Sequence, residues 1–514
     1  MAVIKPPGVY IVEKDAFPNS VVEVATAVPA FIGYTEKADD KGKSLKNVPW
    51  RISSRAEFLT YFGGSPKATF NVKPIEQPAA SAPAQPAARA PEKAFSLGDI
   101  DYVVTATQKS EERFLLYYSM LLFFQNGGGP CYIVSVGTYD EPITAKKLTD
   151  GITLLLKEQE PTMVVIPDAV RLDRAGCQDV QAAALMHCGK DTQSRVVILD
   201  IYNGFEDWHP NEEDCVTQFR NDIGTNYLDF GAAYFPWLRT SIVADTDPDF
   251  DYSLVNSTDL TALLTAEAVE VAQEPNGKPL RPNVIAEVKT LTEEYNAQLL
   301  HKTLVESSPV FSKLLSEIKR QLNLLPPSAA MAGIYSMVDG TSGVWKAPAN
   351  VSLNSVIAPT VNISPEQQQD LNVDVQGKSI NAIRLFSGEG VLVWGARTLD
   401  GNSVDWRYIN VRRTMIMLEQ SIKLAAKAYA FEPNVSTTWV TIKSMIRNFL
   451  IEIWNRGGLA GATPDDAFAV SCGLGETMTA DDVVEGILRV TVLVAVTHPG
   501  EFIEITFQQQ MQNS

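Results

Sequence analysis

Residues 163–166, Met-Val-Val-Ile, form a short apolar run without a polar side chain. Three similar runs lie in the first half of the chain, at residues 132–136, 196–199 and 232–235. Amphipathic helical stretches separate them, near residues 145–157, 177–188 and 213–222. Continuous apolar strands are typical of a sheet covered on both faces, and their alternation with helices favours parallel pairing. The run at 163–166 therefore predicts one strand of a buried, largely parallel sheet.

The segments before this alternation extend the predicted fold. Residues 28–34 form an apolar run that we expect to be the first core strand. Residues 53–58, Ser-Ser-Arg-Ala-Glu-Phe, indicate a capped helix start, because a small hydroxyl residue precedes an acidic one. Residues 114–124 form a helical apolar stretch, which Asn-Gly-Gly-Gly-Pro at 126–130 ends.

A low-complexity stretch interrupts the chain between residues 74 and 91. It contains five prolines and seven alanines in 18 residues. A stretch with so little apolar bulk cannot form a core, so it is predicted to be a flexible or extended linker in a surface loop. Further along, residues 244–282 are acidic and proline-rich. Residues 284–325 have strong helical character, which Pro326 and Pro327 end.

The last third contains two long helical stretches, at residues 412–431 and 437–455, followed by strands at 467–472 and 486–496. Each helix has an apolar stripe with helical spacing, which predicts a buried face. The stripes are Met415, Leu418, Ile422, Ala425 and Tyr429 in the first helix, and Ile442, Ile446, Phe449 and Ile453 in the second.

Both ends of the chain have strand character. In residues 501–510, Ile503, Ile505 and Phe507 fall on one face, and polar residues fall on the other; Phe502 is the exception. A second candidate strand near the start comprises Val9, Tyr10, Ile11 and Val12. A terminal strand needs a partner for its backbone polar groups. That partner is either the protein's own sheet or, by strand addition, a sheet of another copy.

Composition and charge restrict the partners of this protein. The chain has 514 residues, enough for roughly three domains, and its formal net charge is −18. So acidic a chain is a poor candidate for nucleic-acid or anionic-membrane binding. No apolar run reaches the roughly 18–20 residues of a membrane span, and no signal-peptide pattern opens the sequence. We expect a soluble protein made in the cytoplasm, with its five cysteines reduced and buried.

The nearest candidates for chemistry all fail on geometry or spacing. His187 and Cys188 are neighbours on a predicted helix, so their side chains point about 100° apart. Gly42-Lys43-Ser44 and Gly377-Lys378-Ser379 resemble the end of a phosphate loop but lack its first glycine. An acidic cluster lacks the glycine and glutamate that a calcium loop needs: Asp245, Asp247, Asp249 and Asp251. We therefore expect no catalytic residue, no cofactor and no metal site.

Several ordered blocks occur in the last third: GIYSMVD and GVWKAPAN at 333–339 and 343–350, NAIR at 381–384, VWGARTL at 393–399, YINVRR at 408–413 and AFEPN at 430–434. Together they resemble the contractile tail-sheath family of phage tails, contractile bacteriocins and extracellular injection systems. The opening Pro7-Gly8-Val9-Tyr10 is similar too, whereas the Pro/Ala stretch is a departure. The resemblance places these residues in the family's motif core: Gly333, Tyr335, Trp345, Lys346, Pro348, Asn350, Trp394, Arg397, Arg412, Arg413, Pro433 and Asn434.

The resemblance implies a mixed α/β fold in which an outer domain is inserted into an inner, tube-proximal sheath domain. Extended β-strand arms are then expected at residues 1–20 and 500–514, and the inner domain at 21–38 and 326–499. The outer region, 39–325, would comprise a small segment at 39–70, the Pro/Ala-rich linker at 71–94 and an α/β domain at 95–325. The arms would pair with neighbouring subunits through Val9, Tyr10, Ile11, Val12, Phe502, Ile503, Ile505 and Phe507.

The resemblance also implies a structural subunit and not an enzyme. Such subunits stack as hexameric rings around an inner tube, and the sheath contracts from a metastable extended state to drive the tube through a target envelope. The implied partners are other copies of the chain, the inner tube protein, and baseplate and terminal cap proteins, with a second sheath paralogue as a further candidate. Neither nucleic acid nor direct membrane insertion is expected, and the particle would be a phage tail or an extracellular contractile particle.

Two points stay open at this level. Lys423 and Lys427 on one helix, or Lys443 and Arg447 on the next, are candidate contacts for an acidic tube, although ordinary solvated helix faces are the favoured explanation. The alternatives to a sheath subunit are a non-contractile tail or baseplate protein, or an α/β enzyme with an unrecognised site. The enzyme would need convergent polar residues in a pocket, and the tail protein would lack strand donation at both ends.

Overall fold

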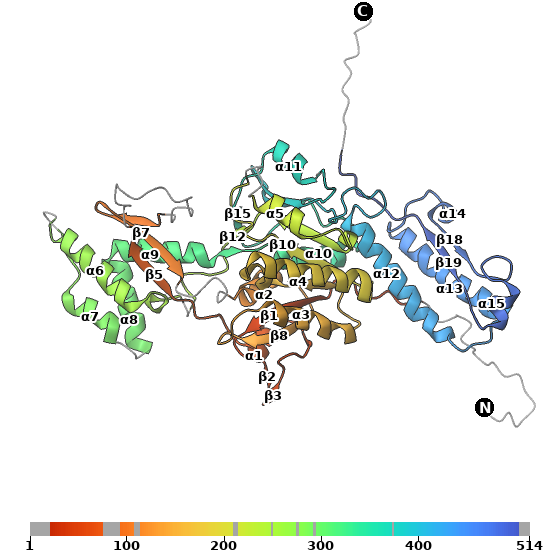
Figure 1. Cartoon of the computed structure of the whole chain (residues 1–514), viewed down its shortest axis with the longest axis horizontal. Helices are drawn as coiled ribbons and strands as arrows, with labels where there is room; N and C mark the ends of the chain where they lie inside the picture. The colour runs from red at the N-terminus through yellow and green to blue at the C-terminus, as the bar shows by residue number, and fades with distance from the viewer. Residues whose placement is uncertain are drawn as a thin grey trace, which may run out of the picture. The chain divides into compact units, whose positions relative to one another are not determined.

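The computed structural model describes residues 21–75, 93–106, 114–208, 214–247, 250–273, 277–290, 294–372 and 375–502. The chain divides into two compact units. The large unit comprises residues 27–341 and 347–409, and the small unit comprises residues 1–26, 342–346 and 410–514. Figure 1 colours the chain from red at the N-terminus to blue at the C-terminus, so the small unit is mostly blue. The predicted mixture of helices and strands is confirmed.

A nine-stranded sheet forms the centre of the large unit, in the order β14-β17-β16-β11-β10-β9-β1-β8-β4. The strands from β16 to β8 in this order pair in parallel. They are β1 (Pro29–Thr35), β8 (Cys131–Thr138), β9 (Met163–Val165), β10 (Val196–Asp200), β11 (Gly231–Phe235) and β16 (Asn381–Phe386). The apolar run at 163–166 thus forms an interior strand, β9, between β1 and β10.

Antiparallel strands complete both edges of this sheet. At one edge, β4 (Trp50–Ile52) pairs with β8. At the other, β17 (Gly390–Trp394) forms a hairpin with β16 and pairs with β14 (Val351–Ser352). The outermost strands have only three and two residues. Such short edges limit strand addition along this sheet.

Helices cover both faces of the central sheet. Successive residues of β1 point to opposite sides of the sheet, so neighbouring residues contact different helices. Phe31 contacts Phe123 of α2 (Leu116–Gln125), with ring centroids 5.0 Å apart. Ile32 faces α3 (Ala145–Leu154), where a Cβ at Gly151 would lie 2.7 Å from its Cγ2. The next helix, α4 (Arg174–Met186), packs beside α3. Thus α2 and α3 lie on opposite faces, and every residue of β1 is buried.

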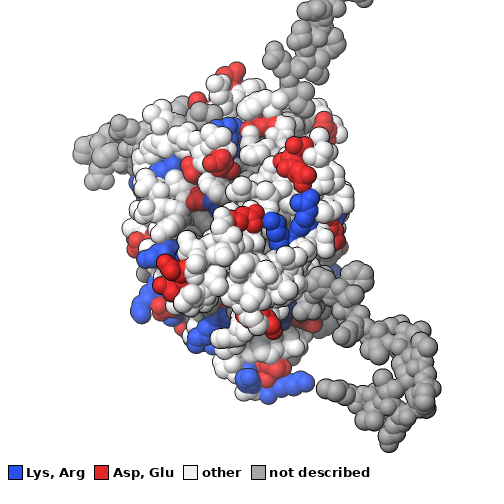
Figure 2. Space-filling model, turned by 90° about the vertical axis from the view of Figure 1, so that its right-hand side faces the viewer, with Lys and Arg blue, Asp and Glu red and all other residues white. Residues whose placement is uncertain are grey.

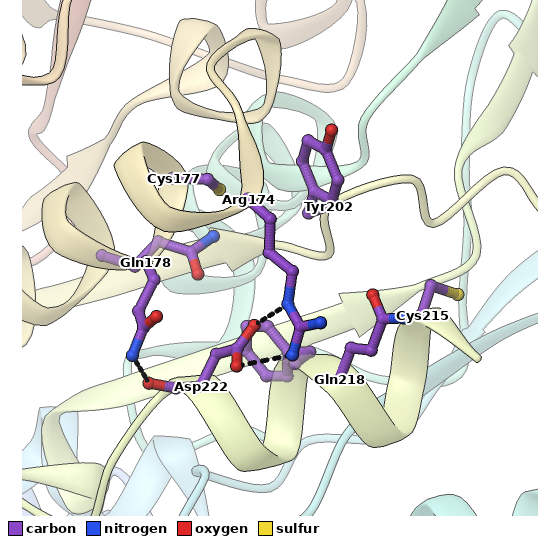
Figure 3. A pocket seen from close by; sticks show the side chains of 9 residues that line it. Arg174, Cys177, Gln178, Tyr202, Cys215, Gln218 and Asp222 are labelled. Atoms are coloured by element: carbon purple, nitrogen blue, oxygen red, sulfur yellow. Dashed lines mark hydrogen bonds and ion pairs between the residues drawn. The ribbon is translucent and has the colours of Figure 1, made fainter. Parts of the chain in front are cut away.

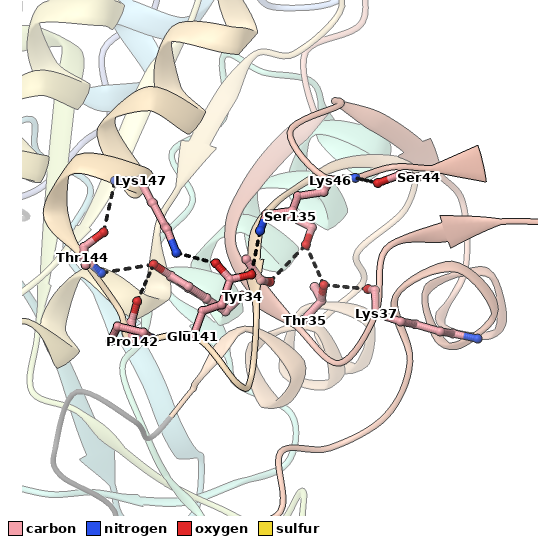
Figure 4. Close-up of polar contacts among 11 residues, drawn as sticks. Tyr34, Thr35, Lys37, Ser44, Lys46, Ser135, Glu141, Pro142, Thr144 and Lys147 are labelled. Carbon is pink, nitrogen blue, oxygen red and sulfur yellow. Dashed lines mark hydrogen bonds and ion pairs between the residues drawn. The ribbon is translucent and has the colours of Figure 1, made fainter. Parts of the chain in front are cut away.

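A polar cluster fixes the carboxyl end of β1, as Figure 4 shows. The Tyr34 hydroxyl donates to the Pro142 carbonyl at 3.0 Å and accepts from the Thr144 amide at 3.1 Å. Glu141 pairs with Lys147 at 2.5 Å and with Lys46 at 2.6 Å. Hydrogen bonds from these two lysines, Lys147 first, lower the pKa of the Glu141 carboxyl to about 2. The cluster joins β1 to the loop that precedes α3.

The large unit also contains a three-stranded antiparallel sheet in the order β5-β7-β6, with bounds Phe70–Pro74, Ile100–Ala106 and Phe95–Leu97. Two helices pack against it, α6 (Ser257–Val271) and α9 (Pro309–Leu322). Two more, α7 (Pro282–Thr290) and α8 (Glu294–Ser307), pack with these helices. The predicted helical character of 284–325 is confirmed. By contrast, α6 occupies a stretch described from sequence only as acidic and proline-rich. Its N-cap Asn256 and buried Leu260, Leu263 and Leu264 are helix features that the average composition of 244–282 obscured.

The small unit is built around two helices and a short hairpin. These are α12 (Ile409–Ala426), α13 (Ser436–Asn455), β18 (Phe468–Ser471) and β19 (Thr491–Val494), and the two strands pair antiparallel. The predicted stripe of α13 is buried throughout. In the stripe of α12, Leu418 is buried while Met415, Ile422, Ala425 and Tyr429 are partly exposed. Among the described residues, no helix has the length and hydropathy needed to cross a membrane.

The boundary between the units differs from the one expected from sequence. Residues 29–35 were expected with the C-terminal third, but they lie in the large unit because β1 pairs with β8 and β9. Residues 347–409 also belong to the large unit, because β16 pairs with β11 and β17 with β16. The assignment of an inner and an outer domain to these units remains a proposal.

Candidate functional site

His187 and Cys188, the neighbouring residues considered as a catalytic pair, have structural roles. His187 and Cys188 are both buried and begin a π-helical turn, His187–Thr192. The His187 Nε2 lies 3.3 Å from Arg195 Nη1, and burial lowers the pKa of His187 to about 4. Burial raises the pKa of the Cys188 thiol to about 12. A protonated thiol is a poor nucleophile, so this pair has no activated group at neutral pH.

The two sequences that resemble phosphate loops have other roles. Lys43 lies in a hairpin of β2 (Asp39–Asp40) and β3 (Lys43–Ser44). Lys378 is buried, and its ammonium donates to the Arg220 carbonyl. Within the ranges that the structure describes, no group of three or more His, Cys, Asp or Glu residues could hold a metal ion.

A pocket between α4 and α5 (Cys215–Asp222) is too small for a metabolite. Its cavity volume is about 10 Å³, whereas small-molecule sites measure roughly 300–1,000 Å³. Figure 3 shows Arg174 reaching across it to Asp222, with Nε–Oδ2 and Nη2–Oδ1 distances of 2.5 and 2.8 Å. Gln178 donates to the Asp222 carbonyl at 2.7 Å. These contacts fasten two neighbouring helices together.

A larger hollow of about 570 Å³ lies within the large unit. Its charged lining residues carry both signs, Arg55 and Lys67 against Asp247 and Asp251. The described lining includes no histidine and no cysteine. An imidazole base and a thiol nucleophile are therefore absent from these walls.

The motif residues of the large unit hold its elements close together. Gly333 lies in α10 (Ser328–Ser342), where a Cβ would come within 2.7 Å of the Phe123 carbonyl oxygen of α2. The hydroxyl of Tyr335, on the same helix, lies 2.7 Å from that of Tyr234 in β11. Asn350 has a left-handed backbone (φ 56°), and its amide donates to the Val393 carbonyl at 2.8 Å. Pro348, two residues before Asn350, is buried.

Trp394 and Arg397 flank the end of the β16–β17 hairpin. The Trp394 ring packs on Phe386 at 4.6 Å and is partly exposed. Arg397 is buried, its amide donates to Asn381 Oδ1 at 2.7 Å, and its guanidinium donates to the Asn372 carbonyl at 2.8 Å. Both residues therefore stabilise the hairpin and its connection to the next loop.

The motif residues of the small unit are mostly buried or hydrogen-bonded. Trp345, Arg412 and Arg413 are buried, and Lys346 is exposed. Asn434 Nδ2 donates to the Ile487 carbonyl at 3.1 Å, and its Oδ1 accepts from Trp439 Nε1 at 2.6 Å. The Pro433 carbonyl accepts from Thr438 Oγ1 at 2.8 Å, which helps to begin α13.

The four candidate tube contacts fall into two different environments. Lys443 pairs with Glu476 at 3.2 Å, and Arg447 pairs with Asp465 at 2.9 Å. Lys423 and Lys427 are exposed and have no ion pair among the described residues. The face in Figure 2 carries acidic and basic side chains interspersed, without a broad patch of one sign. Any charge-based contact there would therefore be local.

The candidate arms fall largely outside the described residues. Val9, Tyr10, Ile11, Val12, Ile503, Ile505 and Phe507 all lie there. Phe502 is described, and its side chain is 77% exposed. The segment next to the first arm, residues 21–26, is held in the small unit: the Val24 amide donates to Ser421 Oγ at 3.1 Å, and Arg413 donates to the Thr26 carbonyl at 3.0 Å.

Two buried carboxylates, Asp168 and Asp200, were not predicted from the sequence. Asp168 follows β9 and accepts from the amides of Tyr34 at 2.9 Å and Leu115 at 2.7 Å. Asp200 ends β10, and burial raises its pKa to about 7 and that of Asp168 to about 6. An acidic residue within two positions of the end of an apolar run is the sequence feature that could have revealed them. Both tie strand ends to other elements.

Comparisons with known proteins show similarity to phage tail sheaths. Residues 402–510 match the family described as the phage tail sheath C-terminal domain. The tail sheath protein of Vibrio phage KVP40 is 27% identical over 135 residues, 26% of this chain and 20% of that protein. That of Enterobacteria phage T4 is 25% identical over 126 residues, 24% and 19% of the two chains. The alignments therefore span about a fifth of these curated relatives.

The fold matches solved sheaths along nearly the whole chain. The sheath of an extracellular contractile injection system, PVC, in its contracted state is 25% identical, with a TM-score of 0.58 and 99% of both chains covered. The helical sheath of the anti-feeding prophage, AFP, in its contracted state is 26% identical, with a TM-score of 0.58 and coverage of 99% and 100%. The resemblance to contractile tail sheaths that the sequence blocks indicated is thus confirmed.

Proposed function

We propose that this chain, similar to contractile sheath proteins along nearly its whole length, is the structural subunit of a contractile sheath. The observation that carries the proposal is the full-length match to injection-system sheaths in their contracted state. The described residues include no group of His, Cys, Asp and Glu that could hold a metal ion, and the buried His187–Cys188 pair has no activated nucleophile, which is consistent with a structural role.

Assembly through terminal strands is the first part of the proposal. The β18–β19 hairpin has two strands, and Leu493 in β19 is 65% exposed. A two-stranded hairpin is marginally stable alone and gains from further strands. We propose that residues 9–12 and 502–507 of neighbouring copies add to such hairpins. Contacts of this kind do not close on themselves, so they generate an open helical lattice, here of stacked hexameric rings.

The second part of the proposal concerns conformational energy stored in the lattice. The extended lattice would be metastable, and contraction would release free energy through better packing between subunits. No nucleotide is required by this mechanism. The inserted elements of the large unit would lie on the outside of the sheath, and the small unit would face the tube.

The partners follow from this arrangement. An inner tube protein would lie inside the sheath, and baseplate and terminal cap proteins would bound it, with a second sheath paralogue as a further candidate. Lys423 and Lys427 are the better of the two pairs of tube contacts, because neither charge is neutralised within the described residues. The particle would be assembled in a bacterial cell as a phage tail or an extracellular contractile particle.

Truncation of each arm tests this proposal. Variants lacking residues 1–13 or 501–514 should remain folded, as judged by circular dichroism, but should not form long tubes in electron micrographs. The full chain, expressed with its tube and baseplate partners, is the control and should form sheaths that contract without added nucleotide. Long tubes from either truncated variant, or strict dependence of contraction on ATP, would contradict the proposal.

A further inference from the structure

A cluster of side chains in the small unit contacts the segments next to both proposed arms. It comprises Glu23, Trp345, Asn410, Arg456 and Thr497, which we call the root cluster. All five residues belong to the small unit. Glu23 lies just after the first proposed arm, and Thr497 lies just before the second.

Arg456 holds the N-terminal side of the cluster. Its Nη1 donates to Glu23 Oε2 at 2.5 Å, and its guanidinium carbon lies 4.9 Å from the centroid of the Trp345 ring. A guanidinium over an indole face gains a cation–π contact in addition to the ion pair. Arg456 therefore binds the segment 21–26 to the tryptophan.

Two glycines let other backbone segments approach Trp345 closely. A Cβ at Gly343 would lie 2.4 Å from Trp345 Cζ2, and a Cβ at Gly458 would lie 2.9 Å from Cε3. Gly343 also has a positive φ of 94°, which favours glycine. Trp345 is consequently confined, with only 9% of its surface exposed.

Asn410 holds the C-terminal side. Its Nδ2 donates to the Trp345 carbonyl at 2.8 Å and contacts the Thr497 carbonyl at 3.4 Å. The Thr497 hydroxyl donates to the Gly457 carbonyl at 3.1 Å, one residue after Arg456. The Ala460 amide also donates to the Ala495 carbonyl at 2.7 Å. The segment 495–497 is therefore held by the same loop that carries Arg456.

The place of Trp345 in the chain adds a third connection. Residues 342–346 belong to the small unit, whereas the residues immediately before and after them belong to the large unit. The cluster thus joins three chain segments: those beside the two arms, and the short passage of the chain from the large unit into the small one and back.

We propose that the root cluster fixes the bases of both arms to each other and to the chain passage at Trp345, with Arg456 as the positioning residue. This rests on the proposed sheath function, because fixed bases matter when the arms pair with neighbours. Two arms held to one rigid point would keep a set geometry as subunits rearrange. A displacement of residues 342–346 would then shift the bases of both arms, and so alter both proposed contacts with neighbouring subunits.

The test compares Arg456→Gln with Arg447→Gln in the full-length soluble chain. Arg447 is a matched control, because it has similar exposure (45% against 43%), pairs with a carboxylate and lies 5.7 Å from the Phe468 ring, yet contacts neither root segment. Hydrogen exchange is measured on peptides covering 21–26 and 495–499. Arg456→Gln should speed exchange in both peptides by about fivefold, the combined effect of an exposed ion pair and a cation–π contact. Arg447→Gln should leave both unchanged, and Arg456→Lys should partly restore protection.

Sheath length in electron micrographs provides the second readout. With tube and baseplate partners present, Arg456→Gln should give shorter or irregular sheaths, and Arg456→Lys should partly restore their length. Unchanged exchange in Arg456→Gln, or a change confined to residues 21–26, would overturn the coupling whether or not sheaths form. If Arg456→Gln speeds exchange in both peptides but the unsubstituted chain forms no sheath, the coupling through the root cluster is supported and the proposed sheath function is rejected.

Discussion

Asp200 at the end of β10 accepts two hydrogen bonds from Ser328, the first residue of α10, from the amide at 2.8 Å and from the hydroxyl at 2.5 Å. The carboxylate is buried and separated from Ser328 by 128 positions in the chain. A carboxylate at a helix N-terminus satisfies amides that have no partner within the helix. This contact therefore fixes α10, which carries Gly333 and Tyr335, to the central sheet.

Replacing Asp200 should reveal both its packing role and its titration. Asp200→Ala leaves the Ser328 donors unpaired in a buried site, which should destabilise the large unit by about 1–3 kcal/mol. Asp200→Asn keeps an acceptor and should cost less. Urea unfolding monitored by tryptophan fluorescence measures both effects.

The pH dependence of the unfolding free energy follows from the raised pKa of Asp200. Burial raises the Asp200 pKa from 3.8 to about 7, so the folded state retains the proton that the unfolded chain releases. The unfolding free energy should therefore fall as the pH rises from about 4 to 7, by up to ~1.4 kcal/mol per pH unit from this group. Asp200→Asn removes this contribution, and the difference between the two curves isolates it from Asp168. Parallel curves for the two proteins would contradict the assignment.

The linker should tolerate shortening but not complete removal. Pro74 of β5 and Phe95 of β6 both pair with Tyr102, on opposite sides of β7. The connection must therefore cross two strand spacings, roughly 10 Å, which about four extended residues can span. Deletion of 78–90 should leave the melting temperature unchanged.

Deletion of 74–91 is the informative comparison. It removes Pro74 and also Ile75, whose amide donates to the Asp101 carbonyl at 2.7 Å. This larger deletion should lower stability measurably in differential scanning fluorimetry. If the two deletions behave alike, the crossing over β7 does not limit the length of the linker.

Charge reversal on α12 and the turn that follows it should weaken the contact with the tube. Lys423→Glu with Lys427→Glu alters two exposed charges that have no ion pair among the described residues. Co-sedimentation with purified tube should fall, and the loss should be largest at low salt, because exposed charges are screened within about 10 Å at 0.1 M. The control is Lys443→Glu with Arg447→Glu, since those charges are already paired with Glu476 and Asp465. Equal loss in both double variants would argue against a specific tube surface on α12.

The strands and helices of the α/β alternation were predictable because their information is local. The apolar run at 163–166 became β9, and residues 53–58 began α1 (Arg55–Phe62), with Ser54 accepting from the Glu57 amide. Hydrophobic periodicity and capping depend on residues within a few positions of each other. The ordered blocks also indicated the resemblance to contractile tail sheaths without any long-range information.

Which segments are neighbours in space follows from the folded structure and not from local sequence. It placed β1 between β8 and β9, and it joined Asp200 to Ser328 and Glu23 to Arg456, residues 128 and 433 positions apart. Pairing between distant segments depends on how the whole chain closes its core, and no local spacing encodes it. The sequence indicated an α/β, sheath-like chain without recognisable chemistry. The fold brought the segments beside both proposed arms to one loop, where Arg456 binds Glu23 and the Gly457 carbonyl accepts from Thr497, because such contacts form only when distant parts of the chain close around a common core.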